Sequence, residues 1–326
     1  MNKTEIKHSL LKAQSVVALV IMCLLLAFLS DRFLTGENLW NVMRQISVNV
    51  VISVGMTLVI LTGGIDLSVG SVLALCGAVT ALLLQSVTPV EPLGIVVGFT
   101  LFGAIAGGIV TGLFLGWFNG LAVTRFRVPP FVATLAMLTM ARGLTMLLTG
   151  GFPVTGMGDS MAYIGTGWFL GVPMPVWISA VVVIATMVVT RRTRFGRHVY
   201  AVGGNEKAAA LSGLKIGRIK LAVYAIAGAL AAVGGIIVTS RLDSAQPNAG
   251  TGFELDSIAA VVIGGTSLNG GKGTILGTVQ GALIIGILNN GLVLLNVSPF
   301  WQQVIKGLVI LLAVVVEKVS KKGTRD

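Results

Sequence analysis

One long polar stretch interrupts an otherwise apolar chain, and it constrains the fold more than any other feature. Residues 190–220 carry eight lysines and arginines against a single acid, Glu206. Apolar runs long enough to cross a bilayer lie on both sides of this stretch. Because positively charged loops stay on the cytoplasmic side of a membrane, the stretch predicts which way its neighbouring segments point.

The composition places the chain in a membrane. With 55% hydrophobic and 11% charged residues, 326 residues have too little polar surface to cover a water-soluble globule. The net charge of +11 comes from short loops between apolar runs. It is therefore interpreted as a topology signal and a contact with anionic lipid headgroups of the bilayer, not as a nucleic-acid surface. The 43 glycines favour close packing of helices.

The apolar runs predict an all-α integral membrane protein with about ten transmembrane helices, some of them short or broken. The predicted spans are 14–29, 46–61, 71–85, 93–123, 131–148, 175–189, 219–240, 256–264, 274–295 and 300–316. With ten spans, all but five of the 23 lysines and arginines lie on the cytoplasmic side, together with both termini. The whole chain, 1–326, forms one transmembrane domain, within which 191–218 is a cytoplasmic loop.

Nothing in the sequence predicts catalysis, a metal site or a cofactor. His8 and His198 are far apart, and Cys23 and Cys76 both lie in apolar runs, where cysteine is usually a small core residue. The chain also lacks paired carboxylates and a nucleophile beside a base, so an intramembrane enzyme is disfavoured.

The stretch GTSLNGGKG, 265–273, has the glycines and the lysine of a phosphate-binding loop but not its spacing. Five residues separate Gly265 from Gly271 where the loop requires four, and Gly273 stands where a serine or threonine must reach magnesium. The chain is therefore not expected to bind ATP itself.

A few polar residues lie in or beside the predicted spans, where an unpaired charge is costly. They are Asp66, Asn119, Arg142, Asn289, Asn290, Gln302, Gln303 and Lys306. Bonds between helices or snorkelling to the interface explain each residue as well as a transport role does. We expect Asp66 to cap the following helix, and Arg142 and Lys306 to be structural. The amides Asn119, Asn289 and Asn290 are the candidates for a solute path, since amides both donate and accept hydrogen bonds.

Two octapeptides share the pattern Gly-Gly-x-x-Leu-x-x-Gly. They are GGIDLSVG at 63–70 and GGTSLNGG at 264–271, each placed between two spans at the inner face. The pair is either the trace of an internal repeat or two independent tight turns.

Four stretches of the chain resemble the permease subunits of bacterial ABC importers for monosaccharides, the ribose permeases above all. They are VGMTLVILTGGIDLSVGSVLAL, FVATLAMLTMARG, TRFGRHVYAVGGNEKAAALSG and ELDSIAAVVIGGTSLNGGKGTILGT with ILNNGL. The resemblance implies a ten-span transporter subunit, not an enzyme, that pairs with a second and usually identical permease in the bacterial inner membrane. It also implies a cytoplasmic ABC ATPase and a periplasmic binding protein that delivers a monosaccharide, ribose or a related sugar.

The resemblance assigns ATPase coupling to one segment of the cytoplasmic loop. The matching residues are Gly204, Asn205, Glu206, Ala209, Leu211, Ser212 and Gly213, while Lys207 stands where relatives often have a small residue. Independently, Asn205 can cap a short helix that Gly213 ends. A short helix with an Ala/Leu face suits docking in a partner's groove, or lying against the membrane.

A secondary carrier driven by protons or sodium is the alternative function. Such a carrier needs titratable groups in the membrane, and Asp66, Arg142 and Lys306 have no opposite charge near them in the sequence. The sequence does not decide between sugars, or between a homodimer and a heterodimer.

Overall fold

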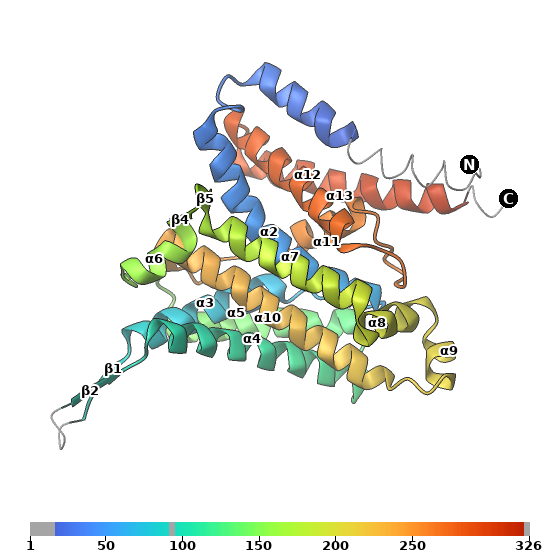
Figure 1. Cartoon of the computed structure of the whole chain (residues 1–326), viewed down its shortest axis with the longest axis horizontal. Coiled ribbons are helices and arrows are strands. Elements are labelled where there is room, and N and C mark those ends of the chain that lie inside the picture. Colours follow the sequence, from blue (N-terminus) through green and yellow to red (C-terminus); the bar gives the residue numbers. More distant parts are fainter. Residues whose placement is uncertain (1–16, 91–94, 323–326) are drawn as a thin grey trace.

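The computed structural model describes residues 17–90 and 95–322, and it places a helix in each of the ten predicted spans (Figure 1). The helices are Val17–Leu29, α2 Gly36–Leu61, α3 Val69–Gln85, α4 Leu101–Thr124, α5 Pro130–Thr149, α7 Met174–Arg192, α10 Ile216–Leu242, α11 Phe253–Ile263, α12 Ile275–Leu294 and α13 Pro299–Lys322. Three short helices lie between them: α6 Asp159–Thr166, α8 Arg194–Gly204 and α9 Glu206–Leu211.

Six of these helices are long and apolar enough to cross a membrane: α2, α4, α5, α7, α10 and α12. Val17–Leu29, α3 and the first part of α13 are apolar but shorter. The protein is thus mostly helical with several candidate membrane spans, as predicted. The count of ten crossings and the orientation of the termini stay predictions, and His8 and the N-terminal lysines lie outside the described residues.

The helices form a bundle with two distinct ends (Figure 1). One end holds the last turn of α7 with Arg191 and Arg192, followed by α8 and α9; we call it the basic end. The other end holds α6 and is called the α6 end. Helix α10 contacts α2, α3, α4 and α6 and so lies inside the bundle.

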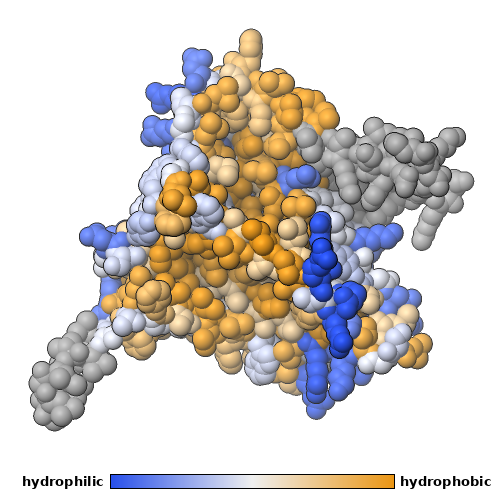
Figure 2. Space-filling model, viewed as in Figure 1, coloured by the Kyte–Doolittle hydropathy of each residue, from blue (hydrophilic) through white to orange (hydrophobic). Residues whose placement is uncertain are grey.

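Burial divides the helices into core and surface. Within the most apolar 18 residues of each helix, 83% are buried in α2 but only 22% in α7. Apolar side chains dominate the middle of the face in Figure 2, and hydrophilic ones lie mostly at its margins. A contiguous apolar surface of this kind suits contact with lipid or with another membrane subunit.

Glycine lets α4 and α10 approach closely, as the sequence predicted. A Cβ at Gly112 would overlap the carbonyl oxygen of Gly228, and a Cβ at Gly228 would overlap that of Gly112. Small residues at such crossings let dispersion contacts form between backbones, which is how membrane helices are held together.

The predicted fourth span, 93–123, begins too early. Strands β1 Val87–Val90 and β2 Ile95–Gly98 pair as an antiparallel hairpin, and α4 starts only at Leu101. The segment Ile-Val-Val at 95–97 is β-branched and therefore favours strand. The α6 end also holds two pairs of two-residue strands, β3 Val154–Thr155 with β6 Ser244–Ala245, and β4 Trp168–Phe169 with β5 Val172–Pro173.

Candidate coupling segment and intramembrane polar sites

Helix α9 forms where the sequence predicted a short capped helix. The Asn205 side chain accepts a hydrogen bond from the Ala208 N–H at 3.0 Å, which makes Asn205 the N-cap. Past the helix, Gly213 has φ +82°, a left-handed conformation that glycine adopts without strain. Local capping chemistry thus fixes both ends of α9.

The predicted Ala/Leu face of α9 is divided between two surroundings. Ala209 is buried and packs with Val199, Val202 and Ile219 of the same chain. Leu211 is 90% exposed and projects from the basic end. Ala209 therefore holds α9 on its own subunit, and Leu211 is the apolar group that a partner can reach.

An ion pair ties α9 to α10. The Lys220 ammonium lies 2.7 Å from the Glu206 carboxylate. The sequence analysis named Glu206 but missed its partner, because fourteen residues and a turn separate the two. An exposed pair of this kind contributes about 0–1 kcal/mol to stability, so its main effect is on the position of α9.

The C-terminal end of α8, which contains Gly203, packs directly against the end of α2 and the loop between α11 and α12. A Cβ at Gly203 would overlap the Leu61 carbonyl oxygen and the Gly271 nitrogen. The Gly271 N–H donates to the Leu61 carbonyl at 2.9 Å, and the Tyr200 hydroxyl donates to the Gly273 carbonyl at 2.9 Å. Burial raises the pKa of the Tyr200 hydroxyl above its ordinary value. We call the contact of Leu61, Gly203 and Gly271 the glycine junction.

The two octapeptides with the shared pattern meet at the glycine junction. A Cβ at Gly270, in the second octapeptide, would lie against the Gly63 nitrogen of the first and against Gly203. The first octapeptide leads into α3, and the second joins α11 to α12. The loop that carries α9 therefore touches the segments that start two membrane helices.

Asp66 was expected to cap α3, but it stands two residues before the N-cap position and bonds to the residue there. Its carboxylate accepts from the N–H and the hydroxyl of Ser68, at 2.9 and 2.6 Å, and Ser68 is the residue at the N-cap position of α3. Asn119 donates to the same Ser68 hydroxyl at 3.0 Å and is 1% exposed. The structure thus places Asn119 in a buried contact between α4 and the start of α3, and its role in a solute path stays a prediction.

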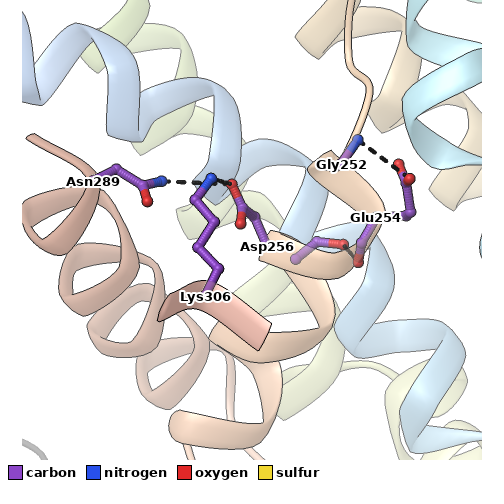
Figure 3. A network of polar contacts seen from close by, with 6 residues as sticks. Gly252, Glu254, Asp256, Asn289 and Lys306 are labelled. Atoms are coloured by element: carbon purple, nitrogen blue, oxygen red, sulfur yellow. Dashed lines mark hydrogen bonds and ion pairs between the residues drawn. The ribbon is translucent and has the colours of Figure 1, made fainter. Parts of the chain in front are cut away.

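Lys306 pairs with an acid that the sequence analysis did not single out. Its ammonium lies 3.0 Å from Asp256, a residue of α11 that is almost fully buried (Figure 3). Asn289 points at the same carboxylate from α12, at 3.5 Å. The site therefore joins α11, α12 and α13, and it supports the structural role expected for Lys306.

Asn290 and Gln302 are satisfied within the chain. Asn290 and Asn38 exchange two amide hydrogen bonds, at 2.9 and 3.1 Å, between α12 and the start of α2. Gln302 donates to the Val297 carbonyl at 2.8 Å. Both amides have partners within the chain, and the role of Asn289 and Asn290 in a solute path stays a prediction.

Arg142, which the sequence analysis expected to be structural, bonds to backbone carbonyls. Its guanidinium donates to Pro247 and Ala249 at 2.5 and 2.9 Å. These carbonyls belong to the segment between β6 and α11, which thereby is held against α5. Arg142 is a structural anchor for that segment.

Comparison with known proteins places the chain in a transport family. The profile described as "Branched-chain amino acid transport system / permease component" matches residues 38–314. The chain belongs to this permease family. The ribose import permease protein of Escherichia coli (strain K12) is 49% identical over 95% of each chain. That of Bacillus subtilis (strain 168) is 48% identical over 93% of this chain and 91% of its own.

A relative with lower identity is named for a different sugar, xylose. The xylose transport system permease protein of Haemophilus influenzae is 34% identical over 95% of this chain and 97% of its own. No solved structure matches the permease significantly.

Family membership decides between the two functions that the sequence left open. A permease component is one part of a transport system and not an enzyme. An ion-coupled carrier works without the other components of such a transport system, so this permease functions as a subunit of an importer.

Proposed function

We propose that this permease is the membrane subunit of an ATP-driven importer for ribose or a closely related monosaccharide, in a bacterial inner membrane. The identity of 49% over 95% of the chain with a ribose permease carries the proposal, since the xylose relative reaches only 34%. Two identical copies form the translocation path. The basic end faces the cytoplasm, and a periplasmic binding protein delivers the sugar to the α6 end.

In this proposal the segment 204–213 docks on the ATPase through α9. The exposed Leu211 enters a groove on the ATPase, while Ala209 and the Glu206–Lys220 pair fix α9 on its own subunit. Movement of α9 then reaches α3 and α12 through the glycine junction, where backbones touch without flexible side chains between them.

Reconstitution of the permease with its ATPase and binding protein in vesicles tests the transport activity. Ribose uptake should require ATP and persist when ion gradients are collapsed, and it should exceed xylose uptake. Uptake that follows an ion gradient and ignores ATP would refute the proposal. Mass measurement of the purified permease in detergent tests the homodimer, which has about twice the 33.8 kDa of one chain.

A matched pair of leucines tests the docking role of α9. Leu211→Glu should uncouple ATP hydrolysis from uptake and weaken ATPase binding, because a charge cannot enter an apolar groove without cost. Leu170→Glu changes a leucine that is 78% exposed at the α6 end and should leave coupling intact. Equal coupling in the two variants would show that α9 does not dock through Leu211.

A further inference from the structure

The segment between β6 and α11 turns back from the α6 end into the bundle. At the α6 end, β6 pairs with β3, and Thr155 of β3 accepts a hydrogen bond from Gln85, the last residue of α3. Only a few residues after β6, Gly250 packs against Gly70 in the first turn of α3. Ala245 packs with Ala78 and Ala81 in the middle of α3, and Gly70 lies about 12 Å farther along the helix at 1.5 Å per residue. Residues 245–250 therefore descend along about half of α3.

Contacts inside the bundle hold this re-entrant segment, 246–252, at depth. A Cβ at Gly70 would overlap the Gly250 carbonyl oxygen, so the two backbones touch. Arg142, on α5, donates to the carbonyls of Pro247 and Ala249. Helix α11 therefore begins within the bundle and not at its α6 end. Broken helices with irregular backbone at membrane depth occur in transporters where they line a cavity.

The re-entrant segment turns its polar side chains away from the bundle. Pro247 and Gly250 are buried, whereas Gln246, Asn248 and Thr251 are exposed. The Thr251 hydroxyl donates to the Asn248 carbonyl at 2.8 Å, and within the described part of the chain the side-chain amides of Gln246 and Asn248 make no hydrogen bond. Unpaired amides cost several kcal/mol in hydrocarbon, so this face does not meet lipid tails.

We propose that Gln246, Asn248 and Thr251 line the sugar path and exchange hydrogen bonds with sugar hydroxyls as the sugar passes. Amides and a hydroxyl donate and accept in turn, which matches the groups of a monosaccharide and not those of an ion. Arg142 is a positioning residue that presents these side chains. The proposal rests on the function proposed above and names the residues that act on the substrate.

Thiol labelling in a permease without its own cysteines tests the proposal. In a Cys23→Ser, Cys76→Ala background, Asn248→Cys should react with a charged, water-soluble methanethiosulfonate, and the labelled importer should lose at least ten-fold of its ribose uptake. Val181→Cys, at an apolar position of α7 that is 65% exposed, should react only with a lipid-soluble maleimide. Phe152→Cys, 75% exposed at the α6 end, should take the charged reagent and keep its uptake.

Two results would overturn the proposal: no reaction of Asn248→Cys with the charged reagent, or full ribose uptake after it has reacted. Thr251→Cys repeats the measurement if Asn248→Cys does not assemble. A second readout is the KM for ribose. Asn248→Leu should raise this KM, and Asn248→Gln should largely preserve it. A purely structural defect would instead lower the amount of assembled permease. Uptake by the cysteine-free parent tests the proposed function separately.

Discussion

At the scale of single residues, the Asp256–Lys306 pair joins α11 to α13 through a buried carboxylate. Replacing Lys306 with methionine leaves a carboxylate that is 5% exposed without its cation. We expect a loss of stability of about 3 kcal/mol, the lower part of the range for broken buried pairs because Lys306 is partly exposed. The thermal midpoint of the permease in detergent measures it.

A double variant separates the pair from the shape of the site. Lys306→Met with Asp256→Asn should recover most of the lost stability, because no uncompensated charge remains. Lys207→Met, an exposed lysine at the basic end, should change stability by less than about 0.5 kcal/mol. If Lys306→Met behaves like Lys207→Met, then the ion pair does not hold α13.

These pairings mark what the sequence could not predict. The costly polar residues of the spans were visible from type and position alone, but Asp256 lies fifty residues before Lys306 and at the edge of a short span. Asn119, Asn289 and Asn290 were assigned to a path because amides suit sugars, and the structure pairs them with Ser68, Asp256 and Asn38. Polar type indicates that a partner exists, and only the fold identifies the partner.

At the scale of elements, the glycine junction depends on one of two adjacent glycines. Gly203→Ala should lower the stability by about 1–3 kcal/mol, since its Cβ would overlap the Leu61 carbonyl oxygen and backbone cannot move aside as a side chain does. Gly204→Ala should be neutral or slightly stabilising, because nothing lies within 4 Å of its Cβ and alanine favours helix. Thermal midpoints compare the two variants, and equal midpoints would argue against a tight junction.

Elements set by local chemistry were predictable, and those set by distant contacts were not. The N-cap Asn205 and the ending glycine of α9 act within a few residues, so the sequence predicted that helix correctly. The hairpin β1–β2 was absorbed into the fourth span because its β-branched residues are as apolar as those of a membrane helix. The re-entrant segment leaves no periodic signal, because its depth comes from Gly70 and Arg142, far away in the chain.

At the scale of the whole molecule, one short stretch touches both regions to which we assign a function. Leu61 lies in the glycine junction, and Gly70 packs against Gly250 of the re-entrant segment. Between them runs the first octapeptide, held by Asp66 and Ser68. A shift of α9 can therefore reach the proposed sugar path through the start of α3 without crossing the rest of the bundle.

The orientation of the two ends in the membrane is the prediction on which this arrangement depends. The basic end holds Arg191, Arg192 and the cations that follow, while the loop 150–173 at the α6 end has no lysine or arginine. We therefore expect Leu211→Cys and Phe152→Cys, in the cysteine-free background, to lie on opposite sides of the membrane. In sealed right-side-out vesicles an impermeant thiol reagent should label Phe152→Cys at once and Leu211→Cys only after permeabilisation. Labelling of both from outside would place α9 out of reach of a cytoplasmic ATPase.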